Sequence, residues 1–504
     1  MADPLAQAIP LRVRRPLFLD GLASRLMDTF TGGPFLAGLA LLLGASNVEL
    51  GLLASLPFLA QAAQLPTLAL LLRVRDRRAT VVWAAGAART LLAAIALLLW
   101  LHPSLVGPGL LIAILAVNAF LVVAATAAWS WWMRDTLPAD RLGAFFGHRM
   151  RWTTAAALVA LLLAGTMLDA FKAAGAETRG YALLFTLGTF AGVGGLVALR
   201  LIPHAPAPHT PSPESRHVVR SLRAALRRPE TSTALWSLSL VSVSLSFALP
   251  FVAVFLLRSL GYSYAVVTGL AVVSQLGYLA GLRGWGHLSD RHGERGVLFA
   301  SLALLAAVQF AWGLTGWSAH GFVPTVGGTA LLAWLGTLHF ASGYAVGGAE
   351  LGGTNLMLKS APAEQAQAHL AAIGLGKAVV AGLGTVAAGL LWQAIGSEDL
   401  LPLASGWGLR GFQVLSLFAA FLTLGSMAMA LRIRETAPVP VSEVARTMRR
   451  EVGQMSSIAG IRGFIHALSY SVEFLAGPFE GRKRRDRART PQAPPVPPPP
   501  AAKP

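Results

Sequence analysis

The stretch Gly286-His-Leu-Ser-Asp-Arg-His-Gly-Glu-Arg295 is short, polar and charged, and it lies between two long apolar runs. A chain embedded in lipid keeps so short a polar linker only where it joins two spans at the water face, because irregular backbone is not tolerated against lipid. Asp290 and Arg291 form its charged centre, and Gly286 and Gly293 flank them. The stretch therefore predicts two membrane-spanning helices joined by a short hairpin.

The composition of the whole chain is that of a membrane protein. Of its 504 residues, 55% are hydrophobic and only 13% are charged, and the mean hydropathy is +0.60. A soluble protein of this length needs far more polar surface, so most apolar side chains are expected to face lipid or other spans. The net charge of +18 is spread over the connections between apolar runs, which argues against nucleic-acid binding. The lack of cysteine excludes disulfides and Cys-ligated metals.

Twelve apolar segments are long enough to cross the hydrocarbon core as helices of about 20 residues each. The sequence therefore predicts an all-α membrane protein with twelve transmembrane helices. The predicted spans lie near 17–43, 48–72, 80–101, 107–131, 150–170, 180–202, 233–257, 264–283, 296–315, 326–357, 368–396 and 410–433.

Lysine and arginine gather in every second connection between these spans, as in 73–78, 134–151 and 216–228. The alternate connections, such as 102–106 and 316–325, carry almost none. Because basic residues resist translocation, the basic side and both termini are predicted to be cytoplasmic, in a cell inner (plasma) membrane. The basic connections are also expected to contact anionic lipid.

The longest internal connection divides the chain into two halves of six spans each. Its proline-rich start cannot be helical, whereas Arg216 to Arg228 is predicted to form a short amphipathic helix on the membrane surface. The predicted organisation is a cytoplasmic N-terminus (1–16), a six-helix bundle (17–202), a linker (203–232), a second six-helix bundle (233–433), an interfacial amphipathic helix (434–480) and a basic, proline-rich disordered tail (481–504).

Short motifs recur at equivalent connections of the two halves. Pro138-Ala139-Asp140 follows the fourth span, and Pro362-Ala363-Glu364 follows the tenth. Asp76-Arg77 follows the second span, as Asp290-Arg291 follows the eighth. Internal repetition of this kind is typical of duplicated transporters.

The stretch 286–295 resembles the loop signature of the major facilitator superfamily, roughly G-x-L-A-D-R-x-G-R-R. Ser289 replaces the alanine of that signature, and Glu294 replaces a basic residue. The residues that match it are Gly286, Leu288, Asp290, Arg291, Gly293 and Arg295. No signature of a particular subfamily is present.

This resemblance implies two six-helix bundles around a central cavity that opens alternately to each side, with spans one, four, seven and ten as its lining. It also implies that the loop residues gate the conformational change, and that Asp290 and Arg291 face the start of span five near Arg149. The residues to which it gives this gating role are Gly286, Asp290, Arg291, Gly293 and Arg295, and more loosely Asp76 and Arg77.

Charged residues inside the predicted spans point most directly to function, because an ion in a bilayer costs several kcal/mol. Arg25 and Asp28 in the first span lie about 15–20 Å deep at 1.5 Å per residue from Arg15, and their spacing puts them on one helical face. They are predicted either to bind substrate or a proton, or to neutralise each other as a structural pair. The following Gly32-Gly33-Pro34 predicts a kink or an unwound turn.

Glu350 lies in a glycine-rich run of the tenth span and is predicted to face the cavity. It is expected either to exchange a coupling proton or to pair with Lys377. Arg89, Arg149 and Lys377 are predicted partners in structural ion pairs. Asn118 and His339 are cavity candidates by the resemblance, although a lone polar residue in a span commonly makes an interhelical hydrogen bond.

The sequence contains no catalytic constellation, no phosphate-binding Gly-x-x-x-x-Gly-Lys-Ser/Thr loop and no histidine pair at metal spacing on a span. It therefore predicts no enzyme, cofactor or metal site. The predicted protein is a monomeric secondary transporter for a small organic solute, coupled to protons through Asp28 or Glu350. Two alternatives stay open: a transporter-shaped scaffold or assembly factor that moves nothing, and a membrane enzyme that acts on lipid.

Overall fold

The computed structural model describes residues 10–64, 66–67, 76–137, 142–202, 224, 226–315, 328–359, 366–395 and 411–431. These residues belong to one compact unit, Met1–Thr447. The predicted interfacial helix in 434–480, the tail 481–504, most of the linker 203–232 and most of the N-terminus 1–16 lie outside the described residues. The motifs Pro138-Ala139-Asp140 and Pro362-Ala363-Glu364 also lie outside the described residues.

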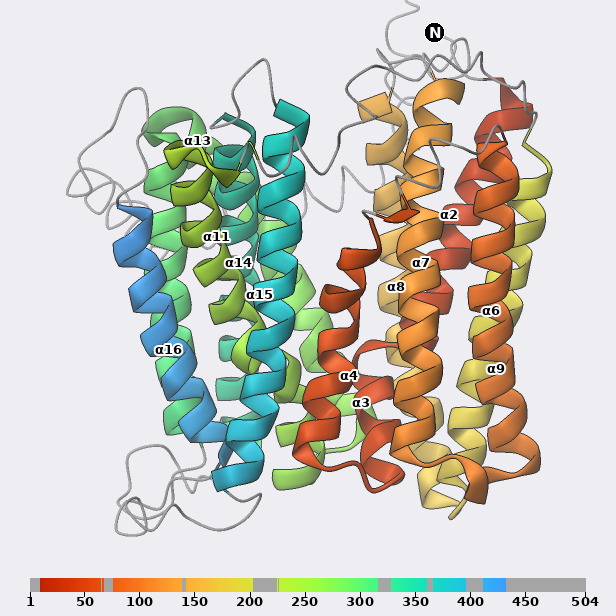
Figure 1. Cartoon of the computed structure of the whole chain (residues 1–504). Coiled ribbons are helices and arrows are strands. Elements are labelled where there is room, and N and C mark those ends of the chain that lie inside the picture. The colour runs from red at the N-terminus through yellow and green to blue at the C-terminus, as the bar shows by residue number, and fades with distance from the viewer. Residues whose placement is uncertain are drawn as a thin grey trace, which may run out of the picture. The chain divides into compact units, whose positions relative to one another are not determined.

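Every regular element among the described residues is helical (Figure 1). The first half contains α2 (Leu11–Thr31), α3 (Gly33–Leu42), α4 (Asn47–Leu59), η1 (Ala60–Ala63), α6 (Arg77–Leu101), η2 (Pro103–Leu105), α7 (Pro108–Thr136), α8 (Leu142–Ala173) and α9 (Glu177–Arg200). The second half contains α11 (Pro229–Ala248), η4 (Leu249–Phe251), α12 (Val252–Val254), η5 (Phe255–Ser259), α13 (Tyr264–Leu314), α14 (Thr329–Lys359), α15 (Ala366–Ile395) and α16 (Gly411–Ala430).

Nine segments of the described chain are long and apolar enough to cross a membrane. Several of their largest apolar side chains point outward, such as Trp83 at 76% and Phe421 at 70% exposure, as lipid-facing residues do. The helix α2 is not among the nine, because it carries charged side chains along its length. The total of twelve spans therefore stays a prediction.

The charged stretch 286–295 is not the ten-residue hairpin that the sequence predicts. Helix α13 continues through it, and the backbone leaves the helical conformation only at Gly293, with φ 78° and ψ 171°. A positive φ of this size favours glycine, which has no Cβ to clash. The stretch stays helical up to this residue, so the change of direction between the two spans takes a single glycine.

Among the described residues, the two halves share a hydrophobic core at one end. There, Phe35 and Tyr181 of the first half belong to one cluster with Phe255, Trp312 and Trp392 of the second. Towards the other end, where α2 begins and Gly293 breaks α13, each half has its own cluster, around Trp132 in the first half and around Leu302 in the second. The halves contact each other chiefly through α4 with α15 and α8 with α13. We call the end with the shared core the closed end.

Candidate functional site

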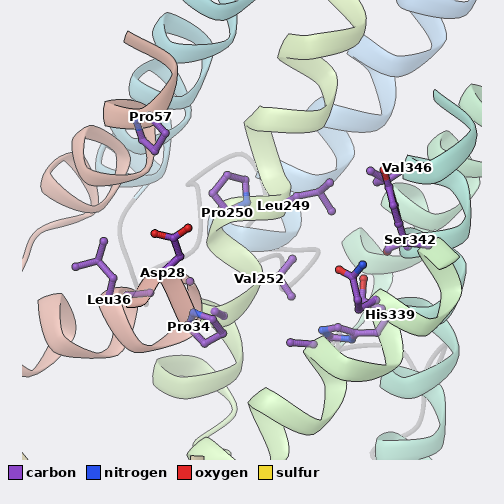
Figure 2. A pocket seen from close by; sticks show the side chains of 18 of the residues that line it. Asp28, Pro34, Leu36, Pro57, Leu249, Pro250, Val252, His339, Ser342 and Val346 are labelled. Atoms are coloured by element: carbon purple, nitrogen blue, oxygen red, sulfur yellow. The ribbon is translucent and has the colours of Figure 1, made fainter. Parts of the chain in front are cut away.

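A cavity of about 1080 Å³ lies between the two halves. Its walls come from α2, α3, α4 and α8 of the first half, and from the α11–η5 segment, α13 and α14 of the second. Figure 2 shows the carboxylate of Asp28 directed into this space, with Pro250 and Val252 beside it and His339 and Ser342 across from it. Most lining side chains are apolar, and the polar groups are few, which is typical of sites for small organic ligands.

Two helical segments, one from each half, are broken where they line the cavity. Helix α2 ends at Thr31 and α3 begins at Gly33, whose φ of 54° requires glycine, so the break lies where Gly32-Gly33-Pro34 predicts it. The predicted span 233–257, by contrast, is not continuous: α11 ends at Ala248 and gives way to the short turn η4 around Pro250. Because Pro250 has no amide hydrogen, the carbonyl of Ser246 loses its helical partner and accepts a hydrogen bond from Thr385 at 3.2 Å instead.

A buried cluster of charges stands behind the cavity wall of the first half. Asp20 is 4% exposed and accepts a hydrogen bond from Arg149 at 3.2 Å, while Arg89 lies 3.9 Å from its other carboxylate oxygen. Ser24 lies between, at 3.5 Å from both Asp20 and Arg89. Arg89 and Arg149, both predicted to form structural ion pairs, thus share Asp20 as their partner. Asp20 is an acidic residue within a predicted span, but it was not among the predicted site residues.

Arg149 lies flat against α2 at Gly21. A Cβ at position 21 would come within 1.9 Å of the Arg149 Nε atom, so any larger residue there would have to displace the guanidinium. The ring of Trp129 lies 5.2 Å from the guanidinium carbon and that of Phe146 lies 5.9 Å away. Arg149 and Gly21 both line the cavity. The contact of Arg149 with Asp290 and Arg291 that the resemblance implies is therefore not the one observed, since Arg149 is held by Asp20 of its own half.

Arg25 and Asp28 both line the cavity and are exposed to it. Within the described part of the chain they form no ion pair with each other, so the alternative that they neutralise each other in direct contact is not what the structure has. Asp28 interacts electrostatically with Arg25 and Arg89 at longer range. The side chains of Arg25 and Asp28 are therefore charged groups accessible from the cavity.

The opposite wall carries Glu350, which is exposed and accepts a hydrogen bond of 2.9 Å from Tyr278. Both residues line the cavity. Lys377 does not line it and makes no ion pair with Glu350 in the described structure; it interacts with that carboxylate only at longer range. The predicted alternative of a permanent Glu350–Lys377 pair is thus not found. Tyr278 lies in the eighth predicted span, two spans before Glu350, and nothing in the sequence marks it as a partner of that carboxylate.

His339 lines the cavity while most of its ring is buried. Its Nδ1 donates to the carbonyl of Leu335 at 2.9 Å, because a carbonyl can only accept, and this leaves Nε2 as an acceptor. The ring meets Trp312 edge-on, with 5.2 Å between centroids. Asn118 does not line the cavity: its amide donates to the carbonyl of Ala88 at 2.8 Å, as an interhelical hydrogen bond between α7 and α6. The cavity role expected for Asn118 is wrong for this structure.

The predicted gating residues lie apart from the cavity. Asp290 and Arg291 are exposed at the end of α13's first part, whereas Glu294, which departs from the family signature, is 1% exposed. Glu294 accepts hydrogen bonds from Ser289 at 2.7 Å and from Lys359 at 2.8 Å. Residues Gly286, Gly293 and Arg295 belong to the same segment, and in the first half Asp76 caps α6 while Arg77 lies over Trp131.

At the closed end, polar side chains join the two halves. The carboxylate of Asp169 in α8 accepts hydrogen bonds from the backbone amides of Tyr264 and Ala265, both at 2.8 Å. The hydroxyl of Tyr264 donates to Glu177 at 2.6 Å and accepts from Tyr181 at 2.8 Å. These contacts cap the first turn of α13 with a group from the other half.

A second set of contacts joins the halves at the same end. Arg258 donates to the side chain of Asn47 at 2.7 Å, and the backbone amide of Asn47 donates to Gln393 at 3.1 Å. The hydrogen bonds that join the halves between described residues all lie at this end. The sequence gives no sign of these pairings, because their members are separated by long distances along the chain.

Two broken helices, one from each half, and a cavity with ionisable groups on both walls are features found together in membrane transporters. Among the described residues, no three His, Cys, Asp or Glu side chains gather as a metal site. The residues that the structure brings to the cavity from the predicted set are Arg25, Asp28, Arg149, His339 and Glu350.

Comparison with known proteins identifies the fold. No protein-family profile and no curated protein sequence matches the chain. A mutant form of the nucleoside transporter NupG superposes with a TM-score of 0.63 at 14% identity, over 84% of this chain and 100% of that one. A bacterial homologue of the human lysosomal transporter Spinster, inward-facing and unoccupied, gives 0.58 at 17% identity, over 85% and 99%. A D-xylose–proton symporter gives 0.57 at 14% identity, over 81% and 96%.

These structures are transporters of the major facilitator type, and the chain has their fold. The predicted fold class, an all-α membrane protein with the fold of this superfamily, is thereby confirmed. The chain is a multi-pass membrane protein.

Proposed function

We propose that this protein is a secondary active transporter that moves a small organic solute by alternating access, coupled to protons through Asp28 or Glu350. The observation that carries the proposal is a cavity shared by two halves, which hydrogen bonds between described residues join at the closed end. Such a cavity reaches the other side when the closed end separates and the opposite end closes. The basic connections favour a topology with the closed end outside and both termini in the cytoplasm.

Asp28 and Glu350 suit proton coupling because each is accessible from the cavity and has few partners. Glu350 accepts one hydrogen bond, from Tyr278, and Asp28 forms no hydrogen bond or ion pair with a described residue. A carboxylate in this setting can bind a proton from one side and release it to the other as the cavity alternates. A scaffold that moves nothing has no use for accessible charges on both cavity walls.

Alternating access is testable without knowledge of the solute, because the chain contains no cysteine. Ser24→Cys and Ser274→Cys each place one thiol in the cavity, on opposite walls. We expect a membrane-impermeant maleimide to label both variants from either side of the membrane. Ser130→Cys, an exposed position on α7 outside the cavity, is the control. Labelling of the cavity thiols from one side alone contradicts transport and favours a static scaffold.

Proton coupling is tested in proteoliposomes with a compound that thermal shift on the purified protein identifies as a ligand. We expect Asp28→Asn or Glu350→Gln to abolish accumulation driven by a pH gradient, while exchange of the solute across the membrane persists. Glu49→Gln serves as the control, since Glu49 caps α4 outside the cavity and glutamine can still accept a hydrogen bond. Unchanged pH dependence in both cavity variants removes the coupling proposal.

A further inference from the structure

We infer that the transported solute is an organic anion, whose carboxylate or phosphate binds between Arg149 and Arg25 on the wall of the first half. This inference rests on the proposed transport function and adds the class of the solute. It follows from the position of the two guanidinium groups, from the balance of charge around the cavity and from the apolar surface opposite.

The two guanidinium groups lie on the same face of α2. Gly21, Ser24, Arg25 and Asp28 all line the cavity, and positions 21 and 25 are one helical turn apart, about 5–6 Å. Because the Arg149 guanidinium occupies the space next to Gly21, it lies one turn from the origin of the Arg25 side chain. A single anionic group between them can accept hydrogen bonds from both, and planar guanidinium groups suit carboxylate and phosphate oxygens.

Arg149 is held in place before any ligand arrives. Asp20 binds one of its terminal nitrogens at 3.2 Å, and Trp129 and Phe146 pack against its guanidinium. Its Nε atom is buried without a hydrogen-bond partner. Arg25, in contrast, has an exposed side chain without a hydrogen bond or ion pair to a described residue. One fixed and one adjustable cation thus face the same space, and fixing a binding group in advance lowers the entropy lost on binding.

The charges of this wall do not cancel. Three positive groups (Arg25, Arg89 and Arg149) stand against two negative ones (Asp20 and Asp28), which leaves an excess of one positive charge. On the opposite wall, the charge of Glu350 is balanced at longer range by Lys377, which does not line the cavity. An uncompensated charge away from bulk water is costly, and a solute with one negative charge relieves that cost. A cationic solute would add to the excess.

The rest of the solute meets an apolar surface. Opposite α2 the cavity is lined by Leu249, Phe251, Val252 and Leu256, and Val346 of α14 lies further across. His339 Nε2 and Gln275 offer hydrogen bonds within this surface. The cavity therefore fits an amphipathic anion with an aliphatic or aromatic body, and it has room for a molecule of drug size.

The test compares molecules that share a phenyl ring and differ in the charged or neutral group attached to it, on the purified full-length protein. The probes are benzoate, phenyl phosphate, benzyl alcohol and benzylammonium, with binding followed by thermal shift and by calorimetry. We expect at least one of the two anions to bind about tenfold more tightly than the alcohol and the ammonium to bind most weakly. Whichever of the two anions binds more tightly shows whether the site recognises a carboxylate or a phosphate.

Substitutions at the site test whether the preference for anions arises from Arg25 and Arg149. Arg25→Gln is expected to lower the affinity for the better anion about tenfold and to leave that for benzyl alcohol unchanged. Arg179→Gln, which removes the same charge from an exposed position on α9 outside the cavity, is expected to change neither. Gly21→Ala, which displaces the Arg149 guanidinium, is expected to act like Arg25→Gln.

Three results would overturn the inference: tighter binding of benzylammonium than of both anions, anion binding that Arg25→Gln leaves unchanged, or no binding of either anion. None of them contradicts transport, which the labelling of Ser24→Cys and Ser274→Cys tests separately. Conversely, anion binding at Arg25 together with labelling from one side alone would retain the site and refute the proposed transport.

Discussion

Some single residues at the cavity wall and at the closed end make contacts that a substitution would disturb. Gly21 is the clearest case, since the Arg149 side chain fills the space that a Cβ would need. Tyr264 is another, because its hydroxyl links Tyr181 and Glu177 at the closed end. In both cases, adding or removing a single heavy atom would disturb a side chain that other contacts hold in position.

Gly21→Ala is predicted to push Arg149 away from Asp20. Overpacking of this kind costs about 1–3 kcal/mol, and the separated charges add to the loss. The melting temperature of the purified variant is therefore expected to fall. Gly147→Ala, a site on α8 where a Cβ meets nothing within 4 Å, is the control and should melt like the parent protein. Equal melting temperatures for both variants would show that Arg149 moves aside freely.

Tyr264→Phe is predicted to ease opening of the closed end. The variant loses a hydrogen bond to the Glu177 carboxylate, and bonds to charged groups contribute about 1.5–3 kcal/mol each. The labelling rate of Ser274→Cys from the outside is expected to rise about tenfold, which corresponds to about 1.4 kcal/mol. Tyr262→Phe, two residues away and without such a link, should leave the rate unchanged. A rate unaffected by Tyr264→Phe would mean that this cluster does not hold the closed end together.

At the scale of elements, close backbone contact between helices of opposite halves holds the closed end. In α4 and α15, a Cβ at Gly389 would lie 2.7 Å from the carbonyl oxygen of Asn47 and 3.0 Å from the Cα of Gly51. Glycine at both positions lets the two backbones touch, which raises the contact area available to each helix. On the same helix, a Cβ at Gly382 would lie 2.7 Å from the side chain of Leu59, whereas a Cβ at Gly374 would meet nothing within 4 Å.

Gly389→Leu is predicted to separate α4 from α15 and to favour the conformation in which the closed end is open. Cavity thiols such as Ser24→Cys should then label faster from the outside and more slowly from the inside. Gly374→Leu, on the same helix but facing open space, is expected to change neither rate. Faster labelling from both sides would instead indicate general loosening of the fold.

At the scale of the whole molecule, transport requires the two halves to rock about the cavity. A covalent link across the closed end should therefore trap the protein with that end shut. Asp169 and Ala265 are suited to this, because a carboxylate oxygen of Asp169 lies 2.8 Å from the backbone nitrogen of Ala265.

The double variant Asp169→Cys/Ala265→Cys is predicted to lose uptake of an identified ligand on oxidation and to regain it on reduction, because the disulfide would hold the closed end shut. Each single variant, which cannot form the link, should respond to neither treatment. Full activity of the oxidised double variant, with the link shown by mass spectrometry, would contradict movement at this end.

Much of the architecture was predictable from the sequence, because hydropathy and basic connections are local properties of the chain. The stretch 286–295 and the apolar runs predict the fold that the comparisons confirm. Asp28 and Glu350 stand out as candidates because ions are rare in spans. The helix break at Gly32 is also predictable from the sequence, because it depends only on the local residues Gly32, Gly33 and Pro34. The count of twelve spans and the topology stay predictions.

Tertiary structure alone decided which charges meet and where the halves touch. Arg149 binds Asp20, which is 129 positions away, and Asn118 turns to a neighbouring helix instead of the cavity. The carbonyl freed by Pro250 is satisfied by Thr385 from another helix. The physical reason is that a helix determines the face on which a side chain lies, but only the packing of helices distant in sequence determines what that face meets.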